Sequence, residues 1–300
     1  MVLSRVNIPA TQLGSWTRSF LDLTKPRLVS MILITTTAGF LLAPASVDWW
    51  QLIKTVIGTA LSAGGTLALN QYLERDTDAL MQRTACRPIP NGRLSPGEAL
   101  IFGLSISTGG VIYLGLAVNL LTAVTITIIH LTYLLVYTPL KQKSPASTFL
   151  GAIPGALPPV VGWTAATGRL EPGAIVLFAI LFWWQLPHSL SIAWLYREEY
   201  ARAGFRLLPI VQPKGKSTFF HIWFQTLILL FVGLLPALPM VQIAGYRYLV
   251  VATIVGSIFF GFSLALVRSP SQLAAKRIMF ASLIYLPVIM VAMIVDKLFL

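Results

Sequence analysis

The sequence predicts an all-α polytopic membrane protein with nine transmembrane helices. Three observations indicate this fold class. Hydrophobic residues make up 56% of the chain and charged residues only 11%, whereas soluble proteins carry about 25% charged residues. Apolar runs of about 20 residues, the length that spans a bilayer, recur along the whole chain. The Lys and Arg residues fall almost entirely in alternate connections between these runs.

Nine apolar segments are long enough to cross the hydrocarbon core. They cover approximately residues 28–44, 51–72, 98–118, 120–138, 147–167, 173–194, 218–239, 247–267 and 278–296. No polar segment of soluble-domain length separates them, so we expect residues 1–300 to form a single membrane domain. An odd number of spans places the two chain ends on opposite sides of the membrane.

The basic residues support this count. Of the 22 Lys and Arg residues, 18 fall on the side of the N-terminus when the nine spans alternate. Only Lys54, Arg169, Arg247 and Lys297 fall on the other side. The positive-inside rule therefore predicts a cytoplasmic N-terminus. The net charge of +12 reflects membrane topology, and we expect no nucleic-acid partner.

Two of the predicted cytoplasmic connections are long, about residues 73–97 and 195–217. Together with Glu98, which directly follows the first of them, they contain six of the ten acidic residues, namely Glu74, Asp76, Asp78, Glu98, Glu198 and Glu199. Loops of this length in a compact protein are more often functional than merely connecting.

The first long loop begins with a spaced polar motif. If the second span continues into the loop, Asn70, Glu74 and Asp78 lie on one helical face at i, i+4 and i+8, with Asp76 on the opposite side. Their hard oxygen atoms suit Mg²⁺ shared with a substrate phosphate. The alternative is an ordinary interfacial helix end whose acids pair with neighbouring arginines in water.

The second long loop repeats the order of acid followed by base. Glu198 and Glu199 precede Arg202, Arg206 and Lys214, on the same predicted side of the membrane. Two such clusters facing each other can bind a diphosphate, through Mg²⁺ on the acids and directly through the bases.

Residues 70–78 resemble the NxxxDxxxD signature of the UbiA-type intramembrane prenyltransferase superfamily, with Glu74 in place of its first Asp. The surrounding sequence is similar to the protohaem IX farnesyltransferase branch of that superfamily. The similarity extends to LTKPRL (23–28), YTPLK (137–141), GALPPVVGW (155–163), WQLPH (184–188) and LYREEYARAGFRLLP (195–209).

This resemblance implies a nine-helix bundle around a central cavity, capped by the loops at about 73–97 and 195–217. It also implies transfer of farnesyl from farnesyl diphosphate to a vinyl group of haem B, with addition of water, to give haem O. The nearest alternative is a related enzyme acting on a quinone precursor or a chlorophyll-type acceptor. A non-catalytic haem-binding or transport protein is the alternative from a different class.

The resemblance further implies roles for individual residues. Asn70, Glu74 and Asp78 would hold one Mg²⁺, and Glu198 or Glu199 a second. The diphosphate would be bound by Lys25, Arg83, Arg87 and Lys141. The second motif departs from the superfamily, because Ala193 stands where an Asp is expected.

The acceptor and the reactive cation need a dry, partly aromatic site. Candidate walls are Tyr72, Tyr133, Tyr137, Trp183 and Trp184, and candidate haem contacts are His188, Gln185, Trp184 and Tyr137. Three roles are open for His188: an iron ligand, a proton relay, or a buried hydrogen-bonded histidine. We expect His130 and His221 to be structural.

The remaining expectations concern packing and location. Gly64, Gly65, Gly151 and Gly155 should allow close helix contact, and Pro154, Pro158 and Pro159 should kink the fifth span. The only cysteine, Cys86, excludes an internal disulfide. No cleavable signal is evident, and residues 1–20 are too short and too poor in Arg for an organelle transit peptide, which favours a bacterial inner membrane. A downstream haem-modifying enzyme is an expected partner.

Overall fold

The computed structural model describes residues 10–241 and 243–299, with side chains from residue 16 onward, and these residues form helices and loops without a β-strand. Eight helical segments are long and apolar enough to cross a membrane. They are α3 (Trp49–Leu73), α5 (Pro96–Ala117), Leu120–Leu140, Ser147–Thr167, α10 (Pro172–Leu195), Lys216–Ala237, α14 (Tyr246–Arg268) and α15 (Gln272–Lys297). The protein is therefore a multi-pass membrane protein.

The ninth candidate span is a bent pair of helices. It combines Trp16–Leu23 of α1 (Ala10–Leu23) with α2 (Pro26–Leu42), and the two parts meet at 46°. Counting this pair, the nine predicted spans are confirmed within the described residues, and α2 corresponds to the span expected at 28–44. Arg5, one of the 18 basic residues counted on the side of the N-terminus, lies outside the described residues.

Three of the spans are composite. Leu120–Leu140 consists of α6 (Leu120–Leu131), the π-helix η1 (Thr132–Tyr137) and α7 (Thr138–Leu140). Ser147–Thr167 consists of α8 (Ser147–Ala156) and α9 (Pro158–Thr167), so the predicted proline kink is present as a break at Leu157. Lys216–Ala237 joins α13 (Lys216–Val232) to the short 3₁₀ helix η2 (Leu235–Ala237).

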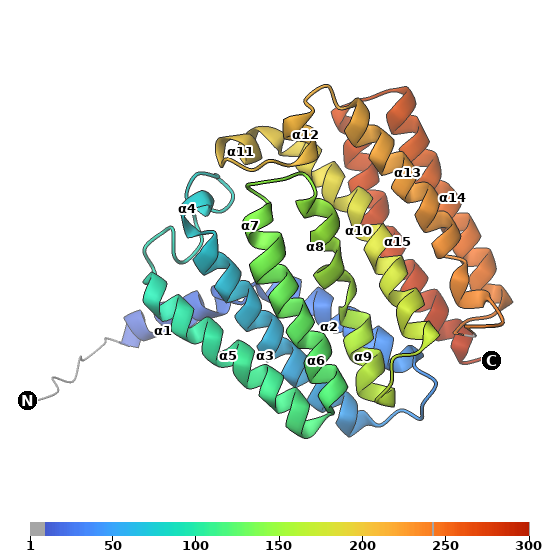
Figure 1. The fold of residues 1–300 in the computed structure, drawn as a ribbon, viewed down its shortest axis with the longest axis horizontal. Coiled ribbons are helices and arrows are strands. Elements are labelled where there is room, and N and C mark those ends of the chain that lie inside the picture. The colour runs from blue at the N-terminus through green and yellow to red at the C-terminus, as the bar shows by residue number, and fades with distance from the viewer. Residues whose placement is uncertain (1–9, 242, 300) are drawn as a thin grey trace, which may run out of the picture.

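Consecutive spans pack beside one another, and the last returns to the first. α3 packs on α5, α10 on α13, α13 on α14 and α14 on α15, while α15 also contacts α2. The short helices α4 (Arg75–Asp78), α11 (Arg197–Arg202) and α12 (Leu208–Val211) all lie at one end of the bundle (Figure 1). We call this the motif end, because it carries both acidic loops.

Small residues allow the helices to approach closely. A Cβ atom on Gly162 of α9 would lie 1.8 Å from the carbonyl oxygen of Thr36 in α2, so only glycine fits this crossing. The predicted role of Gly65 is also confirmed, since its Cβ would lie 2.5 Å from the backbone nitrogen of Ser107 on α5. Glycines at these crossings therefore let α2 pack closely against α9 and α3 pack closely against α5.

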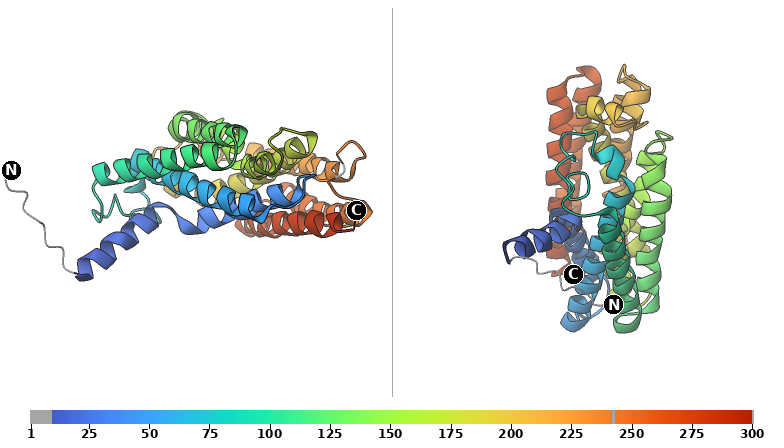
Figure 2. Two further views of the ribbon diagram at one scale, coloured as in Figure 1. Left: turned by 90° about the horizontal axis from the view of Figure 1, so that it is seen from below. Right: turned by 90° about the vertical axis from the view of Figure 1, so that its left-hand side faces the viewer.

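The helix α1 was not predicted. It projects from the side of the bundle (Figure 2) and packs its Phe20 ring 4.8 Å from Phe102 on α5. Asp22 also pairs with Arg93 at 2.7 Å. Because α1 is short and mixed in polarity, a search for uniformly apolar segments does not detect it.

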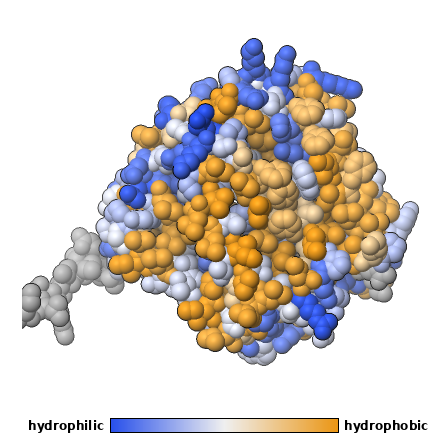
Figure 3. Space-filling view, in the orientation of Figure 1, coloured by the Kyte–Doolittle hydropathy of each residue, from blue (hydrophilic) through white to orange (hydrophobic). Residues whose placement is uncertain are grey.

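The surface of the spans is apolar. Figure 3 shows hydrophobic side chains over most of the spanning helices and hydrophilic side chains gathered at the motif end and at the opposite edge. Exposed apolar side chains such as Leu116 and Leu120 contribute to this surface, as expected for helices facing lipid.

Candidate active site

The polar motif lies at the end of α3, on one face as its spacing predicts. The backbone N–H of Glu74 donates to the carbonyl of Asn70 at 2.9 Å, and that of Asp78 donates to Glu74 at 2.8 Å. The i to i+4 pattern thus continues from α3 into α4. Asn70, Glu74 and Asp78 are buried, whereas the side chain of Asp76 is 87% exposed.

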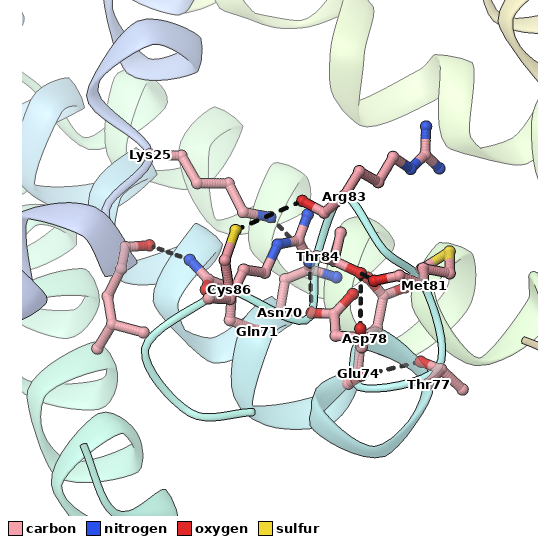
Figure 4. Close-up of polar contacts among 12 residues, drawn as sticks. Lys25, Asn70, Gln71, Glu74, Thr77, Asp78, Met81, Arg83, Thr84 and Cys86 are labelled. Atoms are coloured by element: carbon pink, nitrogen blue, oxygen red, sulfur yellow. Dashed lines mark hydrogen bonds and ion pairs between the residues drawn. The ribbon is translucent and has the colours of Figure 1, made fainter. Parts of the chain in front are cut away.

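Three basic side chains from separate parts of the chain converge on this motif, and Figure 4 shows one of them, Lys25, directed toward Asn70. Lys25 Nζ donates to Asn70 Oδ1 at 3.1 Å, and Lys141 Nζ donates to Glu74 Oε1 at 2.8 Å. Arg87 Nη1 donates to Asp78 Oδ2. Three basic side chains therefore face two carboxylates and a neutral amide, an arrangement suited to an anion.

Lys25 occupies an unusual backbone conformation. Its φ of 50° and ψ of 65° are left-handed, although it carries a side chain and precedes Pro26. It is the only non-glycine residue with positive φ among the described residues. Such conformations cost about 1–3 kcal/mol and are found at functional sites. The conformation lies at the bend between α1 and α2, where the Lys25 ammonium reaches Asn70.

The loop after α4 holds Arg87 in place. The Thr84 hydroxyl donates to the backbone oxygen of Asp78 at 2.7 Å, which folds the chain back over the motif. The Arg87 guanidinium thereby reaches Asp78 Oδ2, while Asp78 Oδ1 is buried without a hydrogen-bond partner. A buried carboxylate oxygen left unpaired is costly, and a metal ion would satisfy it.

The pKa values of these groups reflect competition between burial and charge. Burial opposes ionisation of Glu74, but the adjacent Lys141 outweighs it and lowers the pKa of this carboxyl. Burial raises the pKa of Asp78 more than Arg87 lowers it. Burial alone would lower the pKa of Lys141. Tyr137 and the Glu74 carboxylate outweigh this effect, so the pKa of Lys141 lies above its usual value. Glu74 and Lys141 thus form an ion pair, whereas Asp78 is the more readily protonated carboxylate.

The π-helix η1 places two tyrosines beside this cluster. The rings of Tyr133 and Tyr137 lie 5.3 Å apart, and Lys141 Nζ lies 4.5 Å from the Tyr137 centroid. Gly151 makes room for Tyr137, because a Cβ there would lie 2.3 Å from the ring. These two predicted aromatic walls are therefore near the cations. Tyr72 instead contacts Arg75, and Trp183 packs against Phe149 and Phe182.

Sequence reasoning assigned no role to Thr138. Its hydroxyl accepts from Asn70 Nδ2 at 3.2 Å and donates to the backbone oxygen of Tyr133 at 2.8 Å. Since Lys25 can only donate, Asn70 must present its oxygen to Lys25 and its nitrogen to Thr138. The available signal was the motif YTPLK, which contains Thr138.

The second acidic loop contributes less than predicted. Glu198 is 85% exposed and pairs with Arg197 at 3.8 Å, so the structure does not bring it to the motif. Glu199 is more enclosed and lies 4.0 Å from Arg83. Among residues 10–241 and 243–299, no three or more His, Cys, Asp or Glu side chains gather closely enough to hold a metal alone.

Arg83 points away from Glu74 and Asp78 (Figure 4). Its guanidinium lies 4.4 Å from the ring of Tyr200 and 5.0 Å from that of Tyr196. Arg83 therefore connects the two long loops in this structure, because cation–π contacts and Glu199 hold it there. Of the four predicted diphosphate ligands, three therefore contact the motif: Lys25, Arg87 and Lys141.

The predicted haem contacts on α10 face two different neighbours. Gln185 Nε2 donates to the carbonyl of Ala152 on α8 at 2.7 Å. Trp184 and His188 instead face α15, where both bind Ser282. The other histidines have local partners: His130 Nε2 lies 3.3 Å from the carbonyl of Ser62, and His221 Nδ1 lies 2.7 Å from that of Ser217.

Comparison with known proteins identifies the family. Residues 32–284 match the model of the UbiA prenyltransferase family. The chain belongs to this family. It is 43% identical to the protoheme IX farnesyltransferase of Solibacter usitatus over 290 residues, covering 93% of this chain and 99% of that relative. It is 40% identical to that of Koribacter versatilis over 301 residues, covering 97% and 96%. The expected resemblance is confirmed.

Solved structures share the fold. A digeranylgeranylglyceryl phosphate synthase superposes with a TM-score of 0.81 at 18% identity, covering 95% of this chain and 99% of that one. A UbiA homologue from Archaeoglobus fulgidus bound to GPP and Mg²⁺ gives a TM-score of 0.59 at 15% identity, covering 92% and 99%. The chain therefore has the fold of the intramembrane prenyltransferases.

Proposed function

We propose that this enzyme transfers the farnesyl group of farnesyl diphosphate to a vinyl group of haem B, with addition of water, and releases haem O and diphosphate. Its similarity to protoheme IX farnesyltransferases over nearly the whole chain supports the substrates. The buried motif, where three basic side chains meet two carboxylates, is the structural observation that carries the proposal, because it suits a strongly anionic leaving group.

The reaction begins by ionisation of the allylic substrate. The bond between farnesyl C1 and oxygen breaks, and its electron pair leaves with the diphosphate. Lys25, Arg87 and Lys141 stabilise the negative charge that accumulates on this group. A bound diphosphate would take over the contacts that these cations make with Asn70, Glu74 and Asp78 in the free protein.

The same motif fits a divalent cation. Asn70, Glu74 and Asp78 offer hard oxygen atoms, and Asp78 Oδ1 is buried without a partner. These three residues would hold Mg²⁺, which supplies further positive charge against the diphosphate when bound. Glu199 is the better candidate for a second ion, since Glu198 is exposed.

The farnesyl cation must meet the vinyl group before it meets water. A carbon–carbon bond forms between C1 and a vinyl carbon, water then adds to the resulting cation, and one proton leaves. Tyr133 and Tyr137 offer aromatic faces that tolerate positive charge next to Lys141. The loops at about 73–97 and 195–217 would cap this site and limit the entry of water.

Topology completes the proposal. The distribution of basic residues supports a cytoplasmic N-terminus and a cytoplasmic motif end, in a bacterial inner membrane. Haem O formed there would pass to a downstream haem-modifying enzyme.

A product assay tests the proposal. Purified protein in detergent with Mg²⁺, farnesyl diphosphate and haem B should yield haem O, detected by mass, and chelation of Mg²⁺ should stop the reaction. Failure with haem B, together with prenylation of 4-hydroxybenzoate, would instead indicate an enzyme for quinone precursors.

A further inference from the structure

His188 is held by a residue 94 positions away in the chain. Its Nδ1 atom lies 2.7 Å from the hydroxyl oxygen of Ser282 on α15. The imidazole also stacks on the Trp184 ring, with centroids 5.3 Å apart and planes 13° apart. Trp184 Nε1 donates to the backbone oxygen of the same Ser282 at 2.7 Å. Ser282 on α15 thus holds the His188 imidazole in two ways: directly at Nδ1, and indirectly by binding Trp184, on which the imidazole stacks.

The hydrogen bonds of Ser282 determine which imidazole nitrogen carries the proton. A serine hydroxyl has one hydrogen to donate. Ser282 Oγ donates it to the carbonyl of Met279 at 2.6 Å. Toward His188 the hydroxyl oxygen is therefore an acceptor, so Nδ1 must carry the hydrogen that joins them. In the opposite tautomer, Nδ1 would be an acceptor. The single hydroxyl hydrogen of Ser282 would then face two acceptors, Nδ1 of His188 and the carbonyl oxygen of Met279, at similar distances.

The neutral imidazole then has a free lone pair on Nε2. Within the described part of the chain, Nε2 of His188 has no hydrogen-bond partner, and the residue is half-buried. Ser282 itself is fully buried. Histidines that bind metals commonly use this arrangement, in which one ring nitrogen donates to a protein oxygen and the other faces the metal.

We propose that Ser282 is a positioning residue that holds His188 in the Nδ1–H tautomer, so that Nε2 is presented to the iron of the haem substrate. The inference depends on the proposed function, because it takes haem as the acceptor. It assigns Ser282, which no motif identified, and it selects iron ligation among the roles open for His188.

The chain offers a matched control. Ser263 on α14 is also fully buried, and its hydroxyl donates to the backbone oxygen of Phe260 at 2.7 Å, three residues earlier. Within the part of the chain that the structure describes, no hydrogen bond joins it to a histidine. Ser263→Ala thus removes the same group from the same helical setting, and the backbone oxygen that binds Trp184 is retained in Ser282→Ala.

Nitrogen NMR of the haem-free protein tests the tautomer directly. The chain has only three histidines, so ¹⁵N-histidine labelling gives few signals, and loss of one set in His188→Gln assigns it. We expect wild-type His188 to be protonated at Nδ1 alone and Ser282→Ala to populate the Nε2–H form, while Ser263→Ala matches wild type. An Nε2–H signal in wild type, or no change in Ser282→Ala, would overturn the proposal.

Titration with haem b tests the consequence. Loss of a partner of a ligating histidine weakens metal binding about 10- to 100-fold. Ser282→Ala should lose affinity for haem b by this factor, with an altered Soret band, but should bind iron-free protoporphyrin IX as wild type does. Equal affinity and spectrum in wild type and Ser282→Ala would refute the positioning role of Ser282. If wild type makes haem O in this case, the proposed function still stands; if it makes none, that function fails independently.

Discussion

At the residue scale, the site is defined by how its charges are paired. Each oxygen-bearing residue of the motif has a cationic partner from elsewhere: Lys25 for Asn70, Lys141 for Glu74 and Arg87 for Asp78. Removing one partner of a buried pair is far more damaging than removing an exposed charge. Asp78 is buried and Asp76, two residues earlier, is exposed. Substitutions of these two residues can therefore be compared directly.

Asp78→Asn should lower diphosphate release by about 100-fold or more, since it removes a charge from the group of residues that stabilises the leaving group. Haem binding should be retained. Asp76→Asn is the control, because the Asp76 side chain is 87% exposed, and it should retain activity. Measuring diphosphate release in both variants checks this. Equal rates in the two variants would contradict the assignment of Asp78.

The raised pKa of Asp78 predicts a pH dependence. Metal binding needs the ionised carboxylate, so diphosphate release should fall as the pH drops through this pKa, above the range of an ordinary Asp. Arg87 favours ionisation of Asp78, so Arg87→Gln should raise the pKa further and move the acid limb of the rate profile to higher pH. Arg93→Gln, which changes a surface pair with Asp22, should leave the limb in place. An unmoved limb in Arg87→Gln would argue against control by Asp78.

At the scale of elements, irregularities in the spans shape the site. The π-helix η1 interrupts the span Leu120–Leu140 immediately before Thr138, and the Thr138 hydroxyl bonds to Tyr133, five residues earlier. π-helical turns are rare and often occur at functional sites. Here the irregular turn directs Thr138 toward Asn70 and orients its amide.

Thr138→Val should therefore raise the Mg²⁺ concentration needed for half-maximal activity, by about 10-fold, because Asn70 loses the partner that orients its oxygen. Thr138→Ser keeps the hydroxyl and should restore the wild-type requirement. Activity titrated with Mg²⁺ measures both. If Val and Ser variants behave alike, Thr138 does not act through its hydroxyl.

The crossing of α2 and α9 depends on two glycines, Gly39 of α2 and Gly162 of α9. Gly162→Ala would place a Cβ 1.8 Å from the Thr36 carbonyl oxygen, so the helices must separate, at a cost of about 1–3 kcal/mol. Gly261→Ala in α14 is the control, because a Cβ added there would meet no atom within 4 Å. Thermal stability in detergent should fall for Gly162→Ala only.

At the scale of the whole molecule, both long loops lie at the same end of a ring of helices that closes between α15 and α2. Lys297 strengthens this closure by donating to the carbonyls of Leu41 and Ala43 at 2.9 and 2.6 Å. The acidic motif and its basic partners thus share one end, so under the proposed function the orientation of the chain determines from which compartment diphosphate is released.

The only cysteine in the chain tests this orientation. Cys86 is exposed at the motif end, so a membrane-impermeant maleimide should label it in inverted membrane vesicles and not in intact spheroplasts. The double substitution Cys86→Ser with Arg169→Cys moves the thiol to the exposed turn after α9, where the labelling pattern should reverse. Labelling of Cys86 in spheroplasts would contradict a cytoplasmic motif end.

The sequence by itself determined the nine spans and the alignment of Asn70, Glu74 and Asp78. Both follow from local periodicity: a membrane helix must be apolar over about 20 residues, and residues four apart share a helical face. Only the tertiary structure decided which cations meet these acids, that Arg83 and Glu198 turn away, and that Thr138 and Ser282 orient Asn70 and His188. Apart from the pair of Arg87 and Asp78, those contacts join residues tens of positions apart, and their geometry depends on how whole helices pack.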